Sequence, residues 1–548
     1  MPRLSTFAAA AAVAFLGLRP SAGAAAEGSP MPQVCAAGVC ANDDGVGLLQ
    51  RQVVHAGRLT AQGAPPQMPP QGGTPSVDEP GDFEGGAPPG HAPGDVEGQP
   101  DIEEVRRLVQ ELMREPDFIP QFSVNETRDW YPECHLQDGE CPISDMELGI
   151  IYRVFPRAES GAACIDPTSK FFFEVRRGDP NKLMLQFQGG GACFNYFTVT
   201  EMPNSVLYNH YSPCVQQAIH TPWEGIFDDS NEGNPYRDYS VVNVMYCSGD
   251  IFTGDTERPW GPKRSMVQIR GYRNANAAVE WALGQFPALS HFVFGGQSAG
   301  SLGSQWWADN VLTSFADRNA QTVVLPDSFT GVLNPPRVQE KMEGALHEAW
   351  GMCETPLLGH AESQRCRETE HSIFGRFIDA MRNHRNVRFA MLNSKTDRLQ
   401  ILFERLLAST LFNLKGVVVP EWMFYRDMNR VFRAYAEEPN WLGYLVDGKQ
   451  HTFTKKALAF TTTPLGPDAD EGSPKLMEWI ASLSSFEGMP QMTCLGKHVD
   501  IDETGMIFRG LKYCDSGLMG RWAPNPLSHE LNTNESNTNE SNTNESNT

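Results

Sequence analysis

The sequence predicts an α/β fold in which a mostly parallel, doubly wound sheet carries helices on both faces. Short apolar runs alternate with longer segments of helical pattern such as 274–286, as in repeated strand–helix–strand units. Strands are predicted at 182–187, 240–246, 291–294, 322–325 and 387–392. Each run leads into small or polar residues. Because reactive groups gather at the carboxyl ends of strands in such sheets, these positions are the first place to look for chemistry.

The composition fits a sizeable globular protein. The chain has 548 residues, of which 40% are hydrophobic and 20% charged, so it can bury a large core and wholesale disorder is excluded. The formal net charge of −23 argues against a nucleic-acid partner, because the phosphates would be repelled.

The N-terminal residues have the layout of a secretory signal. The basic Arg3 precedes an apolar stretch at 7–18 and small residues near 22–26, whereas about 20 apolar residues are needed to span a membrane. Residues 1–26 are therefore expected to be a signal peptide. The protein is expected to be secreted, in the extracellular space, the cell wall or the lumen of the secretory pathway, without stable insertion in a membrane.

Two further segments are expected to be disordered. Residues 61–100 contain 10 Pro and 9 Gly, so 27–100 is predicted to be a linker or pro-segment. Residues 526–548 form a polar tail with an Asn-Thr-Asn-Glu-Ser repeat, which leaves 101–525 as the folded domain. N-glycosylation sequons occur at Asn125, Asn534, Asn539 and Asn544, although simple slippage of a repeat explains the tail equally well.

The cysteines are interpreted as disulfides rather than metal ligands. Ten of the twelve lie within 101–525, and an exported protein meets an oxidising compartment. The other two, Cys35 and Cys40, could close a small local loop. No metal and no organic cofactor is expected, since His347-Glu348 lacks the second histidine of a zinc-binding H-E-x-x-H motif.

The sharpest motif is Gly296-Gln-Ser-Ala-Gly300, a G-x-S-x-G between a predicted strand and a helical pattern. This is the context of the nucleophile elbow of α/β-hydrolases, where a sharp turn lifts the hydroxyl of Ser298 above the sheet. The alternative is a glycine-rich turn with a capping serine.

The glycines 189–191 upstream would supply oxyanion donors together with the N–H of Ala299. A phosphate-binding loop competes with this interpretation but lacks the Gly-Lys-Ser/Thr of a P-loop.

In α/β-hydrolases the catalytic residues follow one another along the chain in the order serine, acid, histidine, so the acid and the base are expected after Ser298. His451 lies in a polar turn that suits a loop carrying the base, while His498 lies in a charged stretch and His529 in the tail. Asp327 and Asp397 both follow predicted strands. The second strand after the nucleophile is the commoner place for the acid, which favours Asp397, and Asp327 could instead cap the next turn.

At these residues the chain resembles the pectin acetylesterase family, which includes the carboxylesterase Notum. The matching stretches follow the family's order over about 160–455 and are 188–195, 246–255, 270–274, 296–300, 326–328, 397–400 and 451–453. The resemblance implies an α/β-hydrolase-like, secreted serine esterase that removes acyl groups from pectin or a lipid from a signalling protein.

Carried over to this chain, the resemblance implies a set of site residues. The nucleophile falls on Ser298, the acid on Asp397 and the base on His451, and it settles the acid in favour of Asp397. The implied oxyanion donors are Gly190, Gly191 and Ala299, and the implied disulfides are Cys193–Cys214 and Cys164–Cys247. Two places depart from the family: the glycine loop reads Gly191-Ala192 where the family often carries an aromatic residue, and Ser301 replaces the usual glycine after the elbow.

The expected function is that of a secreted serine carboxylesterase acting on O-acyl esters, with acetyl groups on a polysaccharide as the first choice. The alternatives are a Notum-like deacylase or lipase-type esterase for a longer acyl chain, and a non-catalytic family member that binds glycan. The expected partner is an acylated carbohydrate or an acylated protein. The acidic chain fits poorly with bare polygalacturonate, which is itself anionic.

Overall fold

The computed structural model describes residues 131–200, 223–333, 336–368, 372–412, 416–468, 474–483 and 492–493, with a few positions between 103 and 114. All of them belong to one unit, residues 87–548. The predictions for segments 1–26, 27–100 and 526–548 lie outside the described residues. So do those for Cys35, Cys40, Cys214 and the four glycosylation sequons.

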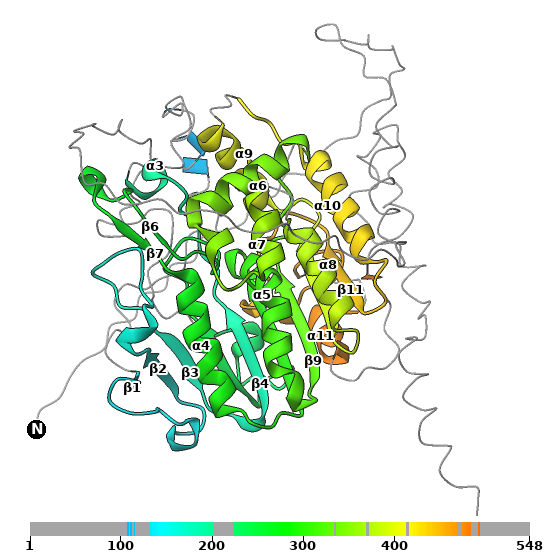
Figure 1. The fold of residues 1–548 in the computed structure, drawn as a ribbon. Helices are drawn as coiled ribbons and strands as arrows, with labels where there is room; N and C mark the ends of the chain where they lie inside the picture. Colours follow the sequence, from blue (N-terminus) through cyan, green and yellow to red (C-terminus); the bar gives the residue numbers. More distant parts are fainter. Residues whose placement is uncertain are drawn as a thin grey trace, which may run out of the picture. The chain divides into compact units, whose positions relative to one another are not determined.

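The strands of the unit are short at its N-terminal side and longer at its centre. They are β1 (Glu133–His135), β2 (Ile151–Phe155), β3 (Phe173–Arg176), β4 (Asp179–Phe187), β5 (Tyr239–Val244), β6 (Thr256–Arg258), β7 (Val267–Ile269), β8 (His291–Gln297), β9 (Gln321–Asp327), β10 (Arg388–Ser394), β11 (Trp441–Val446) and β12 (Met492–Thr493). β6 and β7 form a separate antiparallel pair. The other ten strands form one sheet (Figure 1).

The large sheet has the strand order β1-β2-β3-β5-β4-β8-β9-β10-β11-β12. Only β3 runs antiparallel to its neighbours, and every other pair is parallel. From β4 the chain moves to β5 on one side and then to β8 on the other. This reversal of direction creates a crevice at the carboxyl ends of β4 and β8, where open α/β sheets bind their ligands. The predicted mostly parallel α/β fold is confirmed.

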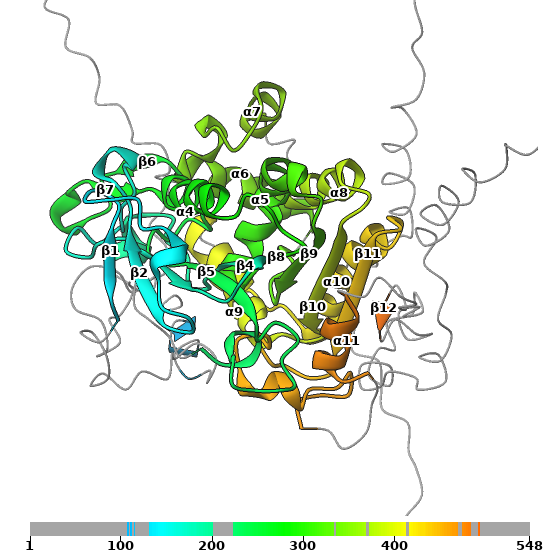
Figure 2. The ribbon, with the colours of Figure 1, turned by 90° about the horizontal axis from the view of Figure 1, so that it is seen from below.

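Helices follow most of the central strands. They are α3 (Tyr196–Thr200), α4 (Gly271–Gln285), α5 (Ala299–Phe315), α6 (Pro336–Trp350), α7 (His360–Arg367), α8 (Ile373–Asn383), α9 (Arg398–Leu411), α10 (Glu421–Tyr435) and α11 (Leu476–Leu483). In Figure 2, α4, α5 and α8 lie on one face of the sheet and α11 on the other. Each face therefore has its own apolar core, as doubly wound sheets require.

The side chains of β4 alternate between the two faces of the sheet, so this strand contributes to both cores. Leu183, Leu185 and Phe187 pack in the larger core, whereas Met184 packs in the smaller one. Successive side chains of a strand point to opposite faces, so a strand covered on both faces is apolar throughout. This explains why the sequence showed continuous apolar runs for the central strands.

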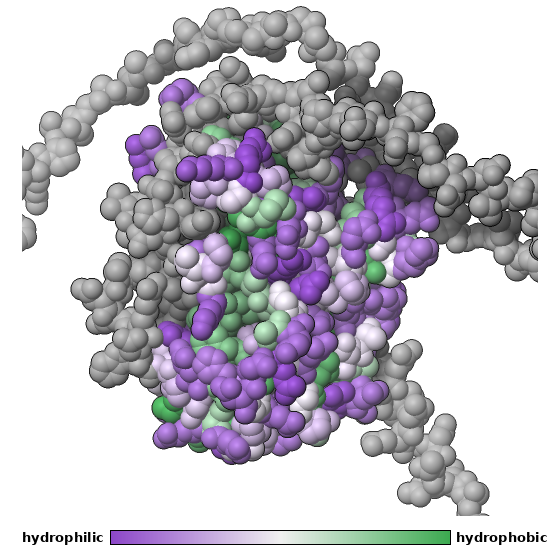
Figure 3. Space-filling model, turned by 60° about the vertical axis from the view of Figure 1, so that its left-hand side comes forward, coloured by the Kyte–Doolittle hydropathy of each residue, from purple (hydrophilic) through white to green (hydrophobic). Residues whose placement is uncertain are grey.

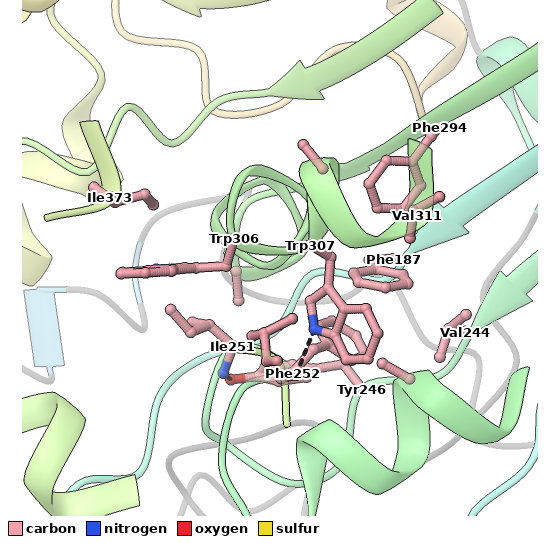
Figure 4. Close-up of a cluster of buried hydrophobic side chains, with 14 of the residues drawn as sticks. Phe187, Val244, Tyr246, Ile251, Phe252, Phe294, Trp306, Trp307, Val311 and Ile373 are labelled. Carbon is pink, nitrogen blue, oxygen red and sulfur yellow. Dashed lines mark hydrogen bonds between the residues drawn. The ribbon is translucent and has the colours of Figure 1, made fainter. Parts of the chain in front are cut away.

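Two adjacent tryptophans on α5 pack in the larger core and point in different directions. Trp307 donates its Nε1–H to the carbonyl of Phe252 at 2.8 Å and meets the ring of Phe187 edge-on at 6.1 Å. Trp306 points away from it, to the side on which Ile373 lies (Figure 4). Both side chains belong to the larger core, and Trp306 also lines the cavity beside Ser298.

Three disulfides join described cysteines. Cys164–Cys247 has an S–S distance of 2.03 Å and ties the segment before β3 to the residues after β5, which is the pairing that the resemblance implied. The other two are Cys134–Cys141 and Cys353–Cys366. Cys193 is also disulfide-bonded.

The face of the unit drawn in Figure 3 is mainly polar. On the face drawn in Figure 3, apolar residues form a strip between polar and charged ones. Large apolar side chains that are well exposed include Leu148, Met266 and Val418. Among the described residues, no helix is long and apolar enough to cross a bilayer.

Candidate active site

Ser298 occupies a sharp turn between β8 and α5. Its φ of 54° and ψ of −120° are unusual for a residue with a side chain, and such strain concentrates at functional sites. The turn requires glycine on both sides. A Cβ on Gly296 would lie 2.4 Å from the carbonyl oxygen of Gly300, and one on Gly300 would lie 2.0 Å from that of Phe187. The G-x-S-x-G motif therefore has the elbow geometry that the sequence predicted.

The structure brings the three predicted side chains together at this turn. The Oγ of Ser298 lies 2.9 Å from Nε2 of His451, and Nδ1 of His451 lies 2.9 and 3.1 Å from the two carboxyl oxygens of Asp397. His451 is 2% exposed and Asp397 is fully buried. This order of contacts is the one that the predicted serine–histidine–acid triad requires.

Asp397 is held by the start of α9, which follows it directly. One carboxyl oxygen caps the helix and accepts the backbone N–H groups of Leu399 and Gln400, both at 3.0 Å. The side chain of Gln400 donates to the other oxygen at 2.8 Å. Sequence reasoning included Gln400 in a matching stretch but gave it no role. Its position one turn after Asp397 on a capped helix was the available signal.

Asp327, the alternative acid, has a different set of contacts. Its Oδ2 accepts the backbone N–H groups of Phe453 at 2.8 Å and Thr454 at 2.7 Å, and the hydroxyl of Thr454 at 2.7 Å. Its Oδ1 accepts the hydroxyl of Ser328. The imidazole of His451 contacts Asp397, while Asp327 fixes the loop that follows His451.

The loops that carry Asp397 and His451 are joined edge to edge. The backbone N–H of Lys395 donates to Val446 at 2.9 Å, and both the N–H and the hydroxyl of Thr396 donate to the carbonyl of Gly448. A buried ion pair, 2.5 Å between the Nζ of Lys395 and the Oδ1 of Asp447, crosses the same junction. Burial lowers the pKa of Lys395, and the facing carboxylate opposes that shift.

The predicted oxyanion donors lie beside Ser298. Gly190, Gly191 and Ala299 line one cavity with it. Ala299 is the first residue of α5, so its N–H is at the positive end of the helix dipole. A Cβ on Gly190 would lie 2.5 Å from the ring of Tyr246, which explains why this loop position takes glycine.

The cavity beside Ser298 has a volume of about 700 Å³, including the open space at its mouth. Its wall is mostly apolar and is built from α5, α6, α8, α9 and the loops after β4, β5 and β9. The apolar lining residues are Ala192, Ile251, Leu302, Trp306, Phe329, Leu333, Leu346, Trp350, Ile373, Phe403 and Leu407. The small side chain of Ala192 adds little bulk to this wall.

A buried aspartate shapes the wall that Ile251 provides. The carboxyl group of Asp250 accepts the hydroxyl of Ser248 at 2.6 Å and the backbone N–H groups of Phe252, Gly254 and Gly271. Burial nevertheless raises the pKa of Asp250 to about 6. These contacts fasten the loop after β5 to the start of α4. They leave Ile251, with a φ of 50°, at the cavity.

His347, Cys353 and Cys366 lie close enough together to suggest a metal site, with ligand atoms within 4.8 Å of one another. The two cysteines are joined in a disulfide, so their sulfurs are not thiolate ligands. The group is better described as a disulfide packed against a buried histidine.

Comparisons with known proteins agree with the resemblance found in the motifs. The model of the pectinacetylesterase family matches residues 145–404, which include Ser298 and Asp397 but end before His451. Two crystal structures of the Wnt deacylase Notum from Drosophila are similar, with 18% and 15% sequence identity and TM-scores of 0.42 and 0.41. Each alignment covers 61% of this chain, and 93% and 92% of the Notum chains. No curated protein sequence matches.

The ion pair between the two loops generates a stability prediction. Substituting Lys395→Met leaves the carboxylate of Asp447 buried without its cation, which is expected to lower the free energy of unfolding by about 3–5 kcal/mol. The double variant Lys395→Met/Asp447→Leu removes both charges and is expected to recover most of that loss. Urea denaturation followed by tryptophan fluorescence measures both.

Lys449 provides a matched control in the same loop. It forms an ion pair of 2.5 Å with Glu421, but both side chains are exposed. Lys449→Met is therefore expected to cost less than about 1 kcal/mol. Equal costs for Lys395→Met and Lys449→Met would show that the buried pair does not join the loops.

Proposed function

We propose that this chain, which matches the model of the pectinacetylesterase family over residues 145–404, is a serine carboxylesterase. In this proposal Ser298 is the nucleophile, His451 the general base and Asp397 the acid that orients it. The supporting observation is the continuous chain of contacts at 2.9 Å from the Oγ of Ser298 through the imidazole of His451 to the carboxyl group of Asp397.

The proposed reaction has two steps. The hydroxyl of Ser298 attacks the ester carbonyl while Nε2 of His451 takes its proton, and the alcohol leaves with that proton. A water molecule, deprotonated by the same imidazole, then hydrolyses the acyl-enzyme and releases the carboxylic acid. In both steps the backbone N–H groups of Gly190, Gly191 and Ala299 would stabilise the tetrahedral oxyanion.

Asp397 would keep the imidazole in the reactive tautomer. An Nδ1–H that donates to the carboxylate leaves Nε2 as the acceptor that faces Ser298. Leu399 and Gln400 hold that carboxylate in place, so little reorganisation accompanies the proton transfer. The buried position of both side chains further limits exchange with water.

The cavity favours a longer acyl chain over the acetyl group expected first. Leu302 and Trp306 lie one and two turns beyond Ser298 on α5, so the apolar wall extends for about 12 Å along that helix at about 1.5 Å per residue. An acetyl group would leave most of this surface uncovered. We therefore propose that the acyl group is a fatty chain, carried on a carbohydrate or a protein.

The disulfides support the proposal that the enzyme is secreted. Three of them join described cysteines, and such bonds persist mainly in oxidising compartments. The role of residues 1–26 as a signal peptide is part of the same proposal.

Substituting the nucleophile tests the proposed mechanism. Ser298→Ala is expected to lower the turnover of p-nitrophenyl butyrate by at least about 10³-fold, because the acyl-enzyme can no longer form. Ser301→Ala, which removes a neighbouring hydroxyl that donates to the carbonyl of Phe329, is the control and is expected to stay active. Release of p-nitrophenol measures the hydrolysis rate of both variants. Equal rates for the wild type and Ser298→Ala would contradict the esterase proposal.

A series of acyl chain lengths tests the proposed acyl group. Wild-type kcat/KM for p-nitrophenyl esters is expected to rise from acetate to octanoate, since each buried methylene adds to binding. Leu302→Trp narrows the cavity and is expected to lower the octanoate-to-acetate ratio by about tenfold or more. A higher kcat/KM for the acetate ester than for the octanoate ester in the wild type would contradict this proposal and favour the acetyl group.

A further inference from the structure

The wall of the cavity is not uniformly apolar. Among the described residues that line it, the ionisable side chains are those of Glu343 and His347. Both belong to α6 and are four residues apart, so they share one face of that helix. α6 therefore presents a carboxyl group and an imidazole to a space that otherwise suits a hydrocarbon chain.

The contacts of His347 account for its position. Its ring meets the indole of Trp306 edge-on at 5.3 Å, and its Nδ1 lies 3.8 Å from the Sγ of Cys366. This histidine is packed between an aromatic ring and a disulfide. His347 contributes to the shape of the cavity, and these two contacts explain its position without a bound ligand.

Glu343 lines the same cavity one turn before His347. It is 7% exposed, and its Oε1 accepts the side-chain N–H of Gln339 at 3.1 Å. Burial raises the pKa of Glu343 to about 8, so at neutral pH most of this carboxyl group is uncharged. An uncharged carboxyl group both donates and accepts hydrogen bonds, which makes it a good partner for a hydroxyl group.

Because its carboxyl group needs hydrogen-bond partners, Glu343 is expected to favour a hydroxylated acyl chain over a plain hydrocarbon chain. A plain hydrocarbon chain would cover the carboxyl group and strip its water without replacing the hydrogen bonds. A chain with a hydroxyl at the matching carbon would restore them. Apolar pockets commonly use one such polar group to fix the orientation of a ligand.

We propose that Glu343 binds a hydroxyl group on the acyl chain, and that the cavity is built for a hydroxylated fatty acyl ester. This inference rests on the proposed function, since it names the acyl group that would be transferred to Ser298. Glu343 would act as a specificity-determining residue and take no part in bond cleavage.

The test compares methyl decanoate with its monohydroxylated isomers, whose hydroxyl lies at carbons 5 to 10. Released acid gives kcat/KM for each ester. In the wild type, at least one isomer is expected to exceed decanoate by about tenfold or more, as for one hydrogen bond gained in a buried site. Absence of any favoured isomer would overturn the inference.

Three variants assign the preference to a residue. Glu343→Leu is expected to abolish the hydroxyl preference, so that decanoate equals or exceeds every isomer. Glu343→Gln, which still donates and accepts, is expected to keep part of it. Glu348→Leu changes an exposed glutamate on the same helix and is expected to leave the ratio at its wild-type value. A hydroxyl preference that persists in Glu343→Leu would contradict the inference.

The ratio is measured within each variant, so it does not depend on how much of the protein is folded. Failure of this inference is also distinct from failure of the proposed function. If hydrolysis depends on Ser298 but shows no hydroxyl preference, only the role of Glu343 is wrong. If hydrolysis of these esters does not depend on Ser298, the esterase proposal fails with it.

Discussion

The close approach of two strand ends is the constraint on which the rest of the site depends. β4 and β8 are parallel neighbours in register from Lys182 and His291 to Phe187 and Gly296. Beyond this pair the backbones nearly touch, and Gly300 has no room for a Cβ beside the carbonyl of Phe187. Because the strands end together, the glycine loop after β4 and the elbow after β8 necessarily share one crevice.

The remaining groups reach the crevice through loops whose positions are fixed by buried polar contacts. Asp397 is held by the helix it caps, and Asp327 holds the segment behind His451. The ion pair of Lys395 and Asp447 joins the loops that carry the proposed acid and base. Buried polar contacts of this kind specify one arrangement of loops more strictly than apolar packing does.

Much of this architecture could be predicted from the sequence because the central strands are buried on both faces. Their continuous apolar runs revealed β4, β5, β8, β9 and β10 to within a few residues. The G-x-S-x-G motif and the chain order also selected side chains that lie together in the structure. β1, β2 and β3 escaped prediction because they are short and carry little periodic pattern.

The cavity could not be predicted, since helices distant in the sequence build its wall. Leu302, Glu343, Ile373 and Phe403 come from four different helices, and no local pattern marks them as neighbours. The loop-holding role of Asp327 was hidden for the same reason. Spacing along the chain could name Asp327 and Asp397 as candidates, but only the fold shows which one contacts the imidazole.

The most direct test of the account is covalent trapping of the nucleophile. A fluorophosphonate reacts with an activated serine, and mass spectrometry of the digested protein locates the adduct. The account predicts one adduct per chain on Ser298, with ester hydrolysis lost in proportion to labelling. An adduct on another residue, or full hydrolysis after Ser298 is completely labelled, would contradict it.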